Sequence, residues 1–244
     1  MNLQNRQFAY PIFVNLTEES ALVVGAGRVG ERKVRGLLRC GARVTVVAPL
    51  ATRAIRKLAT ARKLRWHARE FQPADLRAQR LVFCATDHLD VDLRVARAAR
   101  RRGALVNCAS SLTPALGNFI LPATARTGMV QVAVSTGGAS PALARKLLRR
   151  IVGGLGAQAA RWARLLQQMR PLVVARVPAA RRSALWKHLV ADDLGELLRA
   201  GKLSAARKLA LQRMDAAAPR KRVTANWKDI RKAGGKPVIA QFEF

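Results

Sequence analysis

The first hundred or so residues alternate between short apolar runs and longer stretches with apolar residues at helical spacing. Residues 21–24 are apolar and end at a glycine, and residues 31–40 then carry apolar side chains every three or four positions between charges. A β-branched run at 43–47 follows, and Pro49 stops it. This order predicts a strand, a glycine turn, a helix and a second strand.

The same alternation continues toward the end of this stretch. It predicts helices at 51–62 and 90–102, and strands at 64–68, 80–85 and 104–107. Strands that alternate with helices are typical of a parallel sheet with helices on both faces. We therefore predict an α/β, doubly wound Rossmann-type domain over residues 1–113.

After this predicted domain the chain changes its pattern. Residues 118–122 and 129–134 predict two antiparallel strands, joined by a turn that contains Gly128. The pair Ser140-Pro141 is typical of a helix N-terminus, where serine caps and proline takes the first helical position. A helix that continues to residue 150 is therefore predicted.

The rest of the chain predicts a helical region and a tail. Residues 156–214 carry apolar residues at helical spacing and no convincing strand. The last segment is rich in lysine and arginine, is interrupted by glycines and prolines, and has no clear periodicity. We predict three regions after the Rossmann domain: a small antiparallel sheet with its helix (114–152), a helical domain (153–215) and a basic tail (216–244).

The composition excludes a chain that is disordered throughout. Half of the 244 residues (50%) are hydrophobic, which is enough for a folded core. No apolar stretch approaches the ~20 uninterrupted residues that a membrane span needs, and the first residues lack the pattern of a signal peptide. We therefore expect a soluble, cytoplasmic protein with no membrane partner.

Neither the cysteines nor the histidines are spaced like metal ligands. Cys40, Cys84 and Cys108 are widely separated and lie in or after apolar segments, which predicts small buried side chains in a reducing compartment. The three histidines are scattered along the chain. We predict neither a disulfide nor a metal site from these residues.

The chain is strongly basic, with 45 Lys and Arg against 14 Asp and Glu and a formal charge of +31. The excess is spread along the chain, and aromatic residues, at 5%, do not interleave with the arginines. A solvated, arginine-rich surface therefore accounts for the charge better than a specific nucleic-acid site. A basic nucleic-acid-binding protein stays as an alternative, because charge alone predicts weak binding to DNA or RNA.

The first predicted strand and helix are joined by Gly25-Ala-Gly27-Arg-Val-Gly30. Glycines at this spacing permit a tight turn, a close approach of the backbone to a pyrophosphate, and close packing of helix on strand. The helix N-terminus then faces the phosphates. We predict a dinucleotide site at Gly25, Gly27 and Gly30, with Arg28 and Val29 contacting the cofactor through backbone groups.

The end of the second strand is where a Rossmann domain usually holds a carboxylate for the adenosine ribose. Here Pro49 and Leu50 occupy that place, so backbone groups or solvent would have to meet the ribose hydroxyls. The residues alone do not choose between NAD and NADP.

Polar residues follow the next strands of the predicted sheet. Thr86 and Asp87 come after the strand at 80–85, and Asn107 ends the strand at 104–107. Ligands of doubly wound sheets lie at the carboxyl ends of the strands, so these residues are predicted to border the cofactor crevice, with Thr86 and Asp87 near the nicotinamide. Two alternatives stay open: Asp87 caps the following helix, and the polar groups around Asn107 make only turn hydrogen bonds.

Together these segments resemble the siroheme synthase N-terminal module, a family with precorrin-2 dehydrogenase and sirohydrochlorin ferrochelatase activities. The order and spacing of the segments match the family over roughly 150 residues, and the helical region extends the resemblance to about residue 215. The segments that carry it are Tyr10–Leu16, Gly25–Lys33, Gly41–Pro49, Ala85–Asp87, Asn107, Asn118–Pro122 and Val134–Ala144.

The resemblance implies an enzyme of siroheme biosynthesis that oxidises precorrin-2 to sirohydrochlorin with NAD. It also implies, as a frequent second activity, insertion of ferrous iron into the product, and the sequence leaves open whether this chain retains it. The implied substrate carries many carboxylates, which gives the arginine excess a second use. The resemblance further implies a homodimer, with the small sheet and first helix of region 114–152 making contacts across it.

One position departs from the family pattern. The family usually carries an aspartate, implicated in both activities, three residues after the asparagine matched by Asn107, and here that residue is Ser110. A neutral serine hydroxyl does not replace a carboxylate as a base without an activating partner. We name Ser110 and Asp87 as candidate catalytic residues. Three explanations stay open: proton release without this base, substitution by Asp87, Asp90 or a residue of the partner subunit, and a catalytically impaired relative that binds NAD and tetrapyrrole.

Overall fold

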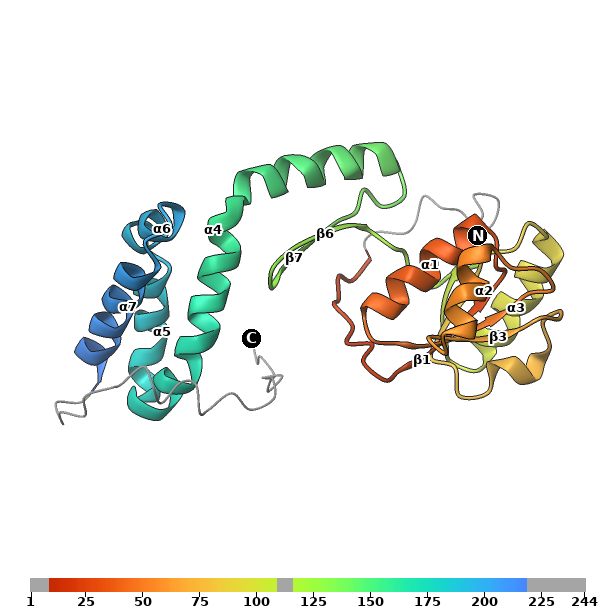
Figure 1. Cartoon of the computed structure of the whole chain (residues 1–244), viewed down its shortest axis with the longest axis horizontal. Helices are drawn as coiled ribbons and strands as arrows, with labels where there is room; N and C mark the ends of the chain where they lie inside the picture. Colours follow the sequence, from red (N-terminus) through yellow and green to blue (C-terminus); the bar gives the residue numbers. More distant parts are fainter. Residues whose placement is uncertain (1–8, 109–115, 219–244) are drawn as a thin grey trace. The chain divides into compact units, whose positions relative to one another are not determined.

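The structure of the chain is a computed structural model that describes residues 9–108 and 116–218. The chain divides into two compact units, and Figure 1 labels many of their helices and strands. The first unit runs to Pro122 and takes in residues 135–140, and the second contains residues 123–134 and the chain from Pro141 onward.

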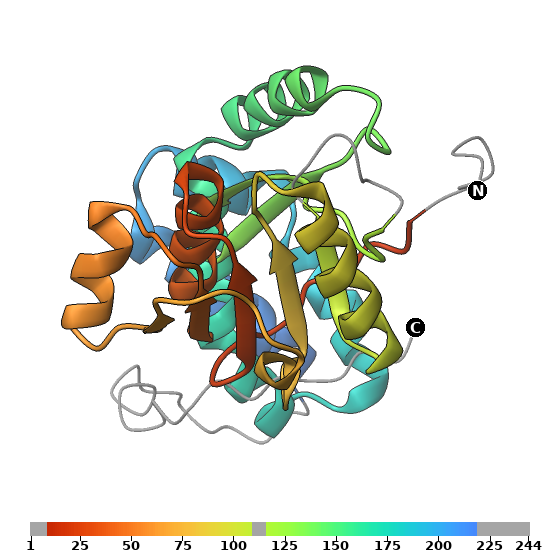
Figure 2. The ribbon, with the colours of Figure 1, turned by 90° about the vertical axis from the view of Figure 1, so that its right-hand side faces the viewer.

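The first unit is built on a five-stranded parallel sheet with the strand order β3-β2-β1-β4-β5 (Figure 2). The strands are β1 (Ser20–Val24), β2 (Arg43–Val47), β3 (Arg65–His67), β4 (Leu81–Cys84) and β5 (Leu105–Cys108). From β1 the chain moves to β2 and β3 on one side, and then crosses to β4 on the other side of β1. The carboxyl ends of β1 and β4 therefore form a topological switch point, where open α/β sheets bind their ligands.

Helices cover both faces of this sheet. They are α1 (Arg28–Arg39), α2 (Arg53–Thr60) and α3 (Leu89–Arg101), with a short 3-10 helix, η2 (Pro73–Leu76). Val34 of α1 and Ile55 of α2 share a core cluster with Val23 of β1. Val95 of α3 packs in a second cluster with Leu22, because successive side chains of a strand point to opposite faces. The predicted α/β, doubly wound fold is confirmed.

Helix α1 ends where the sequence predicts. Gly41 follows the C-cap residue Cys40 in a left-handed conformation (φ +79°). Its N–H donates to the carbonyl of Leu38 (3.1 Å), and the N–H of Ala42 donates to that of Leu37 (3.2 Å). These bonds satisfy carbonyls that the last turn leaves unpaired, and the left-handed residue favours glycine.

The second unit combines a small antiparallel sheet with a helical bundle. Its elements are β6 (Ala123–Thr127), β7 (Val130–Val134), α4 (Pro141–Arg176), α5 (Ala179–Leu189), α6 (Asp192–Arg199) and α7 (Leu203–Ala217). The two strands pair with each other and pack on α4, which bends at Gly156 (φ 60°). Met169, Leu189 and Met214 lie in the core of the bundle. No helix in the described ranges has the length and apolar character needed to cross a membrane.

The first strand of the small sheet lies further along the chain than predicted. Residues 118–122 form no strand, and β6 begins at Ala123. The reason is Asn118, whose Oδ1 accepts from the N–H of Val106 (2.6 Å) and whose Nδ2 donates to the carbonyl of Ala104 (3.1 Å). The segment is therefore bound to the edge of the first sheet, and the antiparallel pair starts only beyond it.

Two further expectations are corrected. The helix that begins at Pro141 extends past the predicted residue 150 to Gly156, whose non-helical backbone (φ 60°, ψ 176°) forms a kink between it and a second helical stretch that reaches Arg176. Cys40 is exposed rather than buried, because it lies at the C-terminus of α1 and not on its apolar face.

Candidate functional site

The glycine turn between β1 and α1 lies at the switch point of the sheet. Gly25 has a left-handed backbone (φ +101°), and a Cβ on it would lie 2.2 Å from the carbonyl oxygen of Ala85, just after β4. A Cβ on Gly30 would lie 2.1 Å from the carbonyl oxygen of Gly25. Both glycines are therefore required by packing within the protein, before any ligand is considered.

Gly27 has a different place in the turn. It is the N-cap of α1, and a Cβ on it would meet no atom within 4 Å. No side chain caps this helix, so the N–H groups of Arg28, Val29 and Gly30 have no capping partner. The space beside these amides is open, and a helix N-terminus attracts anions.

The end of β2 presents no carboxylate. Pro49 and Leu50, which were predicted to meet the adenosine ribose, are both exposed. The loop that follows them is held to the glycine turn by the N–H of Thr52, which donates to the carbonyl of Ala26 (3.1 Å). The structure therefore keeps this part of the predicted site beside the turn.

Glu31 is a residue of this region that the sequence reasoning missed. It lies in the first turn of α1, where its carboxylate accepts from the hydroxyl of Thr52 (2.8 Å) and the guanidinium of Arg35 (2.8 Å). The bond from Thr52, and then that from Arg35, hold the pKa of Glu31 below its usual value. Its spacing of four residues to Arg35 was the available signal.

Thr86 and Asp87 lie in the loop that contacts the glycine turn. A Cβ on Gly25 would be 2.8 Å from the backbone nitrogen of Thr86. Asp87 is exposed and does not cap α3, since the N-cap is His88, whose N–H donates to the hydroxyl of Thr86 (3.2 Å). The alternative in which Asp87 serves only as a helix cap is therefore wrong, and its carboxylate is accessible to solvent.

Asn107 uses both ends of its amide within the protein. It is buried, its Oδ1 accepts from the ammonium of Lys33 (3.1 Å), and its Nδ2 donates to the carbonyl of Phe119 (3.2 Å). The ammonium also lies 5.7 Å from the centre of the Phe83 ring. Burial, and then the charge of Arg32, lowers the pKa of Lys33. Asn107 therefore joins α1 to β5 and to the segment that contains Phe119.

The structure brings some of the predicted site residues into contact and leaves others apart. Gly25, Gly30 and Thr86 come together at the switch point. Asn107 lies on β5, the strand next to β4. Ser110, the position matched to the family aspartate, lies outside the described residues, as does the greater part of the predicted basic tail.

Two thiols lie side by side near this edge of the sheet. Cys84 and Cys108 are register partners at the ends of β4 and β5, and both are free. The contact with the Cys108 thiol, and then burial, raises the pKa of Cys84. Over the ranges 9–108 and 116–218, no group of three His, Cys, Asp or Glu residues could hold a metal ion.

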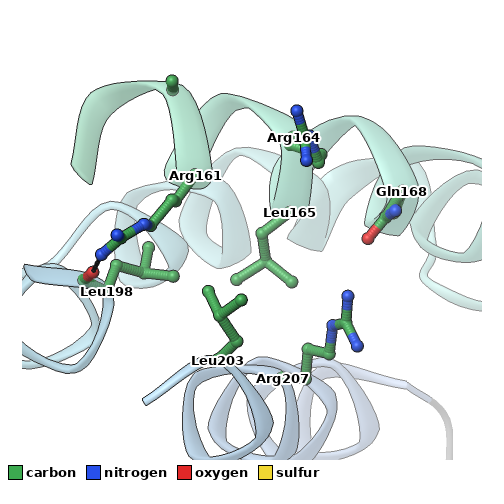
Figure 3. Close-up of a pocket in the computed structure, with 8 residues that line it drawn as sticks. Arg161, Arg164, Leu165, Gln168, Leu198, Leu203 and Arg207 are labelled. Carbon is green, nitrogen blue, oxygen red and sulfur yellow. Dashed lines mark hydrogen bonds between the residues drawn. The ribbon is translucent and has the colours of Figure 1, made fainter. Parts of the chain in front are cut away.

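The second unit contains a small cavity of about 140 Å³ (Figure 3). Leu165, Leu198 and Leu203 point toward one another in it. The guanidinium of Arg161 donates to the carbonyl of Leu198 (2.8 Å) and so satisfies an acceptor in the last turn of α6. The cavity belongs to the helical bundle and contains none of the residues of the glycine turn.

The sheet with its switch point, the glycine turn and the uncapped helix N-terminus define a Rossmann-type nucleotide-binding protein. Three family models match successive parts of the chain. An NAD(P)-binding model matches residues 12–123, the model of the central region of sirohaem biosynthesis proteins matches 128–153, and the model of the sirohaem synthase dimerisation region matches 158–214. The chain belongs to the family of the siroheme synthase N-terminal module.

The relatives of known name agree with these matches. The siroheme synthase of Methylococcus capsulatus is 38% identical over 228 residues, which is 93% of this chain and 47% of the relative. Siroheme synthase 1 of Aeromonas salmonicida is 37% identical over 202 residues, or 82% of this chain and 43% of the relative. The chain thus spans less than half of the length of each of these relatives.

One solved structure matches most of the chain. The chain is similar to SirC, a precorrin-2 dehydrogenase, with a TM-score of 0.71 and 26% sequence identity. The similarity covers 85% of this chain and 100% of SirC.

Proposed function

We propose that this chain is a precorrin-2 dehydrogenase that oxidises precorrin-2 to sirohydrochlorin with NAD. The observation that carries the proposal is the glycine turn, in which Gly27 borders open space at the uncapped N-terminus of α1. The resemblance to SirC over the full length of that protein supports the choice of substrate. The match to an NAD(P)-binding family supports the choice of cofactor.

The residues of the crevice hold the reactants in line for hydride transfer. NAD, when bound, supplies the acceptor for the hydride. The amides of Arg28 and Val29 bind the pyrophosphate, Gly27 leaves room for it, and the loop with Thr86 and Asp87 borders the nicotinamide half. Holding two reactants in this way accounts for a large part of the catalysis of a redox step that needs no covalent intermediate.

Asp87 is the residue that we propose to take up a proton of the reaction. Of the carboxylates around this loop, Glu31 is paired with Arg35 and Asp92 is buried, while Asp90 is exposed in the first turn of α3. Asp87 is exposed in the loop that contacts the turn. Its carboxylate is therefore accessible to act as a base. Ser110 stays a candidate catalytic residue on the basis of the sequence alone.

The substrate class agrees with the charge of the chain. Precorrin-2 carries many carboxylates, and guanidinium groups pair with carboxylates through two parallel hydrogen bonds. Arg28 is exposed at the first position of α1, and Arg32 is exposed one turn further along. We propose that these arginines attract the polyanionic substrate to the crevice.

We also propose that the chain acts as a homodimer. An exposed apolar stripe runs along the first half of α4, made of Leu143, Leu147 and Ile151 at intervals of four residues. Such a stripe on a helix favours a contact with another protein surface. The family model of the dimerisation region supports a second copy of this chain as the partner.

The decisive experiment combines the purified protein with precorrin-2 and NAD. We expect nicotinamide reduction at 340 nm together with the spectrum of sirohydrochlorin, in equal amounts. A parallel reaction with NADP reports cofactor choice. If neither cofactor supports turnover while NAD binding is retained, the chain is a catalytically impaired relative. That outcome is one of the three explanations for Ser110 in place of the family aspartate.

A further inference from the structure

Asp92 is a buried carboxylate that the proposed reaction does not use. It is 1% exposed in the first turn of α3. Asp92 and Asn107 are the buried polar side chains of the described part of the chain. A buried carboxylate requires hydrogen-bond partners, because an unpaired one costs several kcal/mol.

The partner of Asp92 is Thr86. The Oδ1 atom of Asp92 accepts from the Thr86 hydroxyl (2.7 Å), and the backbone N–H of Thr86 lies 3.4 Å from the same atom. The hydroxyl also lies 3.0 Å from the carbonyl of His88, but it has one proton to donate. The hydroxyl therefore donates to the carboxylate of Asp92, since that hydrogen bond is shorter and charge-assisted. The hydroxyl oxygen in turn accepts from the N–H of His88.

These bonds shape the loop that contacts the glycine turn. The backbone of Ala85 and Thr86 is so close to Gly25 that no side chain fits there. The N–H of Ala85 donates to the carbonyl of Val24 (2.8 Å), so the loop is fixed to β1 at its start. Asp92, which lies in α3, fixes the same loop at the next residue, Thr86.

We propose that Asp92 is a positioning residue that holds Thr86, and with it the β4–α3 loop, in the conformation that binds the nicotinamide half of NAD. This inference rests on the proposed NAD site. Burial, and then the nearby charges of Asp87 and Asp90, raise the pKa of Asp92, while its bonds from Thr86 oppose that rise. Burial of the Asp92 carboxyl group is unfavourable by itself, and its hydrogen bond from Thr86, which holds the loop, gives a reason for its presence there.

The test measures NAD binding by titration calorimetry in variants of the full chain. Asp92→Ala removes the acceptor and is expected to weaken NAD binding at least about tenfold. Asp92→Asn keeps an oxygen acceptor for Thr86 and is expected to stay within about threefold of the native Kd. Asp192→Ala is the matched control, because it removes an exposed aspartate from the first turn of α6.

Variants of Thr86 test the same bond from its other end. Thr86→Val should weaken NAD binding as Asp92→Ala does, whereas Thr86→Ser keeps the hydroxyl and should retain native binding. The double variant Asp92→Ala/Thr86→Val should bind NAD no more weakly than either single variant. In turnover, the KM for NAD should rise while the KM for precorrin-2 stays unchanged. These threonine variants decide the question if Asp92→Ala does not fold.

The outcomes separate the inference from the proposed function. If the native chain does not bind NAD, the proposed function fails. If the native chain binds NAD and Asp92→Ala and Thr86→Val bind it equally well, the inference alone fails. Equal losses in Asp92→Asn and Asp92→Ala would overturn the positioning role in favour of the negative charge itself.

Discussion

The carbonyl oxygen of Ala85 occupies the space that a side chain on Gly25 would need. A Cβ on Gly25 would lie 2.2 Å from this oxygen, and the backbone of Gly25 is left-handed (φ +101°). The two constraints are independent, because one is a contact between neighbouring segments and the other is a torsion of the residue itself. A side chain at position 25 would therefore force the end of β4 or the glycine turn to shift.

Gly25→Ala is expected to lower the free energy of unfolding by about 3 kcal/mol or more, because the backbone clash and the left-handed torsion both oppose a side chain. Urea denaturation measures the loss. Gly27→Ala is the matched control in the same turn, where a Cβ meets open space, and should change stability by about 1 kcal/mol or less. Equal losses in the two variants would contradict the packing role of Gly25.

Gly27→Asp is expected to abolish NAD binding and preserve the fold. Aspartate is a good N-cap, so α1 keeps its start, but the carboxylate would enter the open space and repel the pyrophosphate. Calorimetry should show a Kd raised at least about tenfold, or 1.4 kcal/mol. Gly36→Asp adds the same charge further along α1, also into open space, and should bind NAD normally. Normal binding by Gly27→Asp would move the cofactor site elsewhere.

Gly195→Ala should destabilise the helical bundle although alanine favours helices. A Cβ on Gly195 would lie 2.8 Å from the Trp162 ring, which is held by a hydrogen bond to the carbonyl of Leu189 (2.7 Å). We expect a net loss of about 1 kcal/mol, because overpacking exceeds the gain in propensity. Gly36→Ala, in a helix with open space, should instead stabilise by about 1 kcal/mol. Thermal unfolding of both variants checks the opposite signs.

Asp75→Asn should reduce stability at neutral pH and have little effect in acid. Asp75 is largely buried and pairs with Arg69 at 2.6 Å, and the hydrogen bond from that guanidinium holds the pKa of Asp75 below its usual 3.8. A folded-state pKa below the unfolded value stabilises the native state above pH 3.8, and the stabilisation disappears as the pH falls through the folded-state pKa. The expected loss at pH 7 is about 1–3 kcal/mol. A loss that is equal at neutral pH and at about pH 2 would show that the ion pair is not its cause.

Leu147→Glu is expected to weaken the proposed dimer. The substitution places a charge in the middle of the apolar stripe of α4, and a charge that loses water without a partner disfavours association. Light scattering after size-exclusion chromatography should show a shift toward monomer at micromolar concentration. Ala142→Glu, at an exposed position on the far side of the same helix, should leave the association unchanged. An unchanged mass for Leu147→Glu would exclude this stripe from the interface.

Local signals in the sequence predicted the first unit well. The apolar run of β1, the glycine turn and the left-handed Gly41 all depend on neighbours within a few residues, so their pattern is visible along the chain. The helical spacing of residues 156–214 is a local signal of the same kind. By contrast, the strand predicted at 118–122 does not form, because Asn118 bonds to β5, an element more than ten residues away.

The burial of Asp92 on α3 could have been predicted from the sequence. Asp92 precedes Val95, Ala96 and Ala99 by three, four and seven residues, which places a carboxylate on an otherwise apolar stripe. That position alone marked it as buried. Its partner could not be found in the same way, because the contact with Thr86 depends on where the loop after β4 meets the helix.

The sequence by itself determined the Rossmann fold, the place of the glycine turn and the family, because periodicity, turn residues and motif spacing are properties of neighbouring positions. Only the tertiary structure decided which glycine serves packing and which faces open space, since Gly25, Gly27 and Gly30 are alike as residues and differ in what surrounds them. The structure also decided that the amide of Asn107 is occupied by Lys33. Contacts between segments distant in the chain are set by the packing of the whole sheet, and no local pattern encodes them.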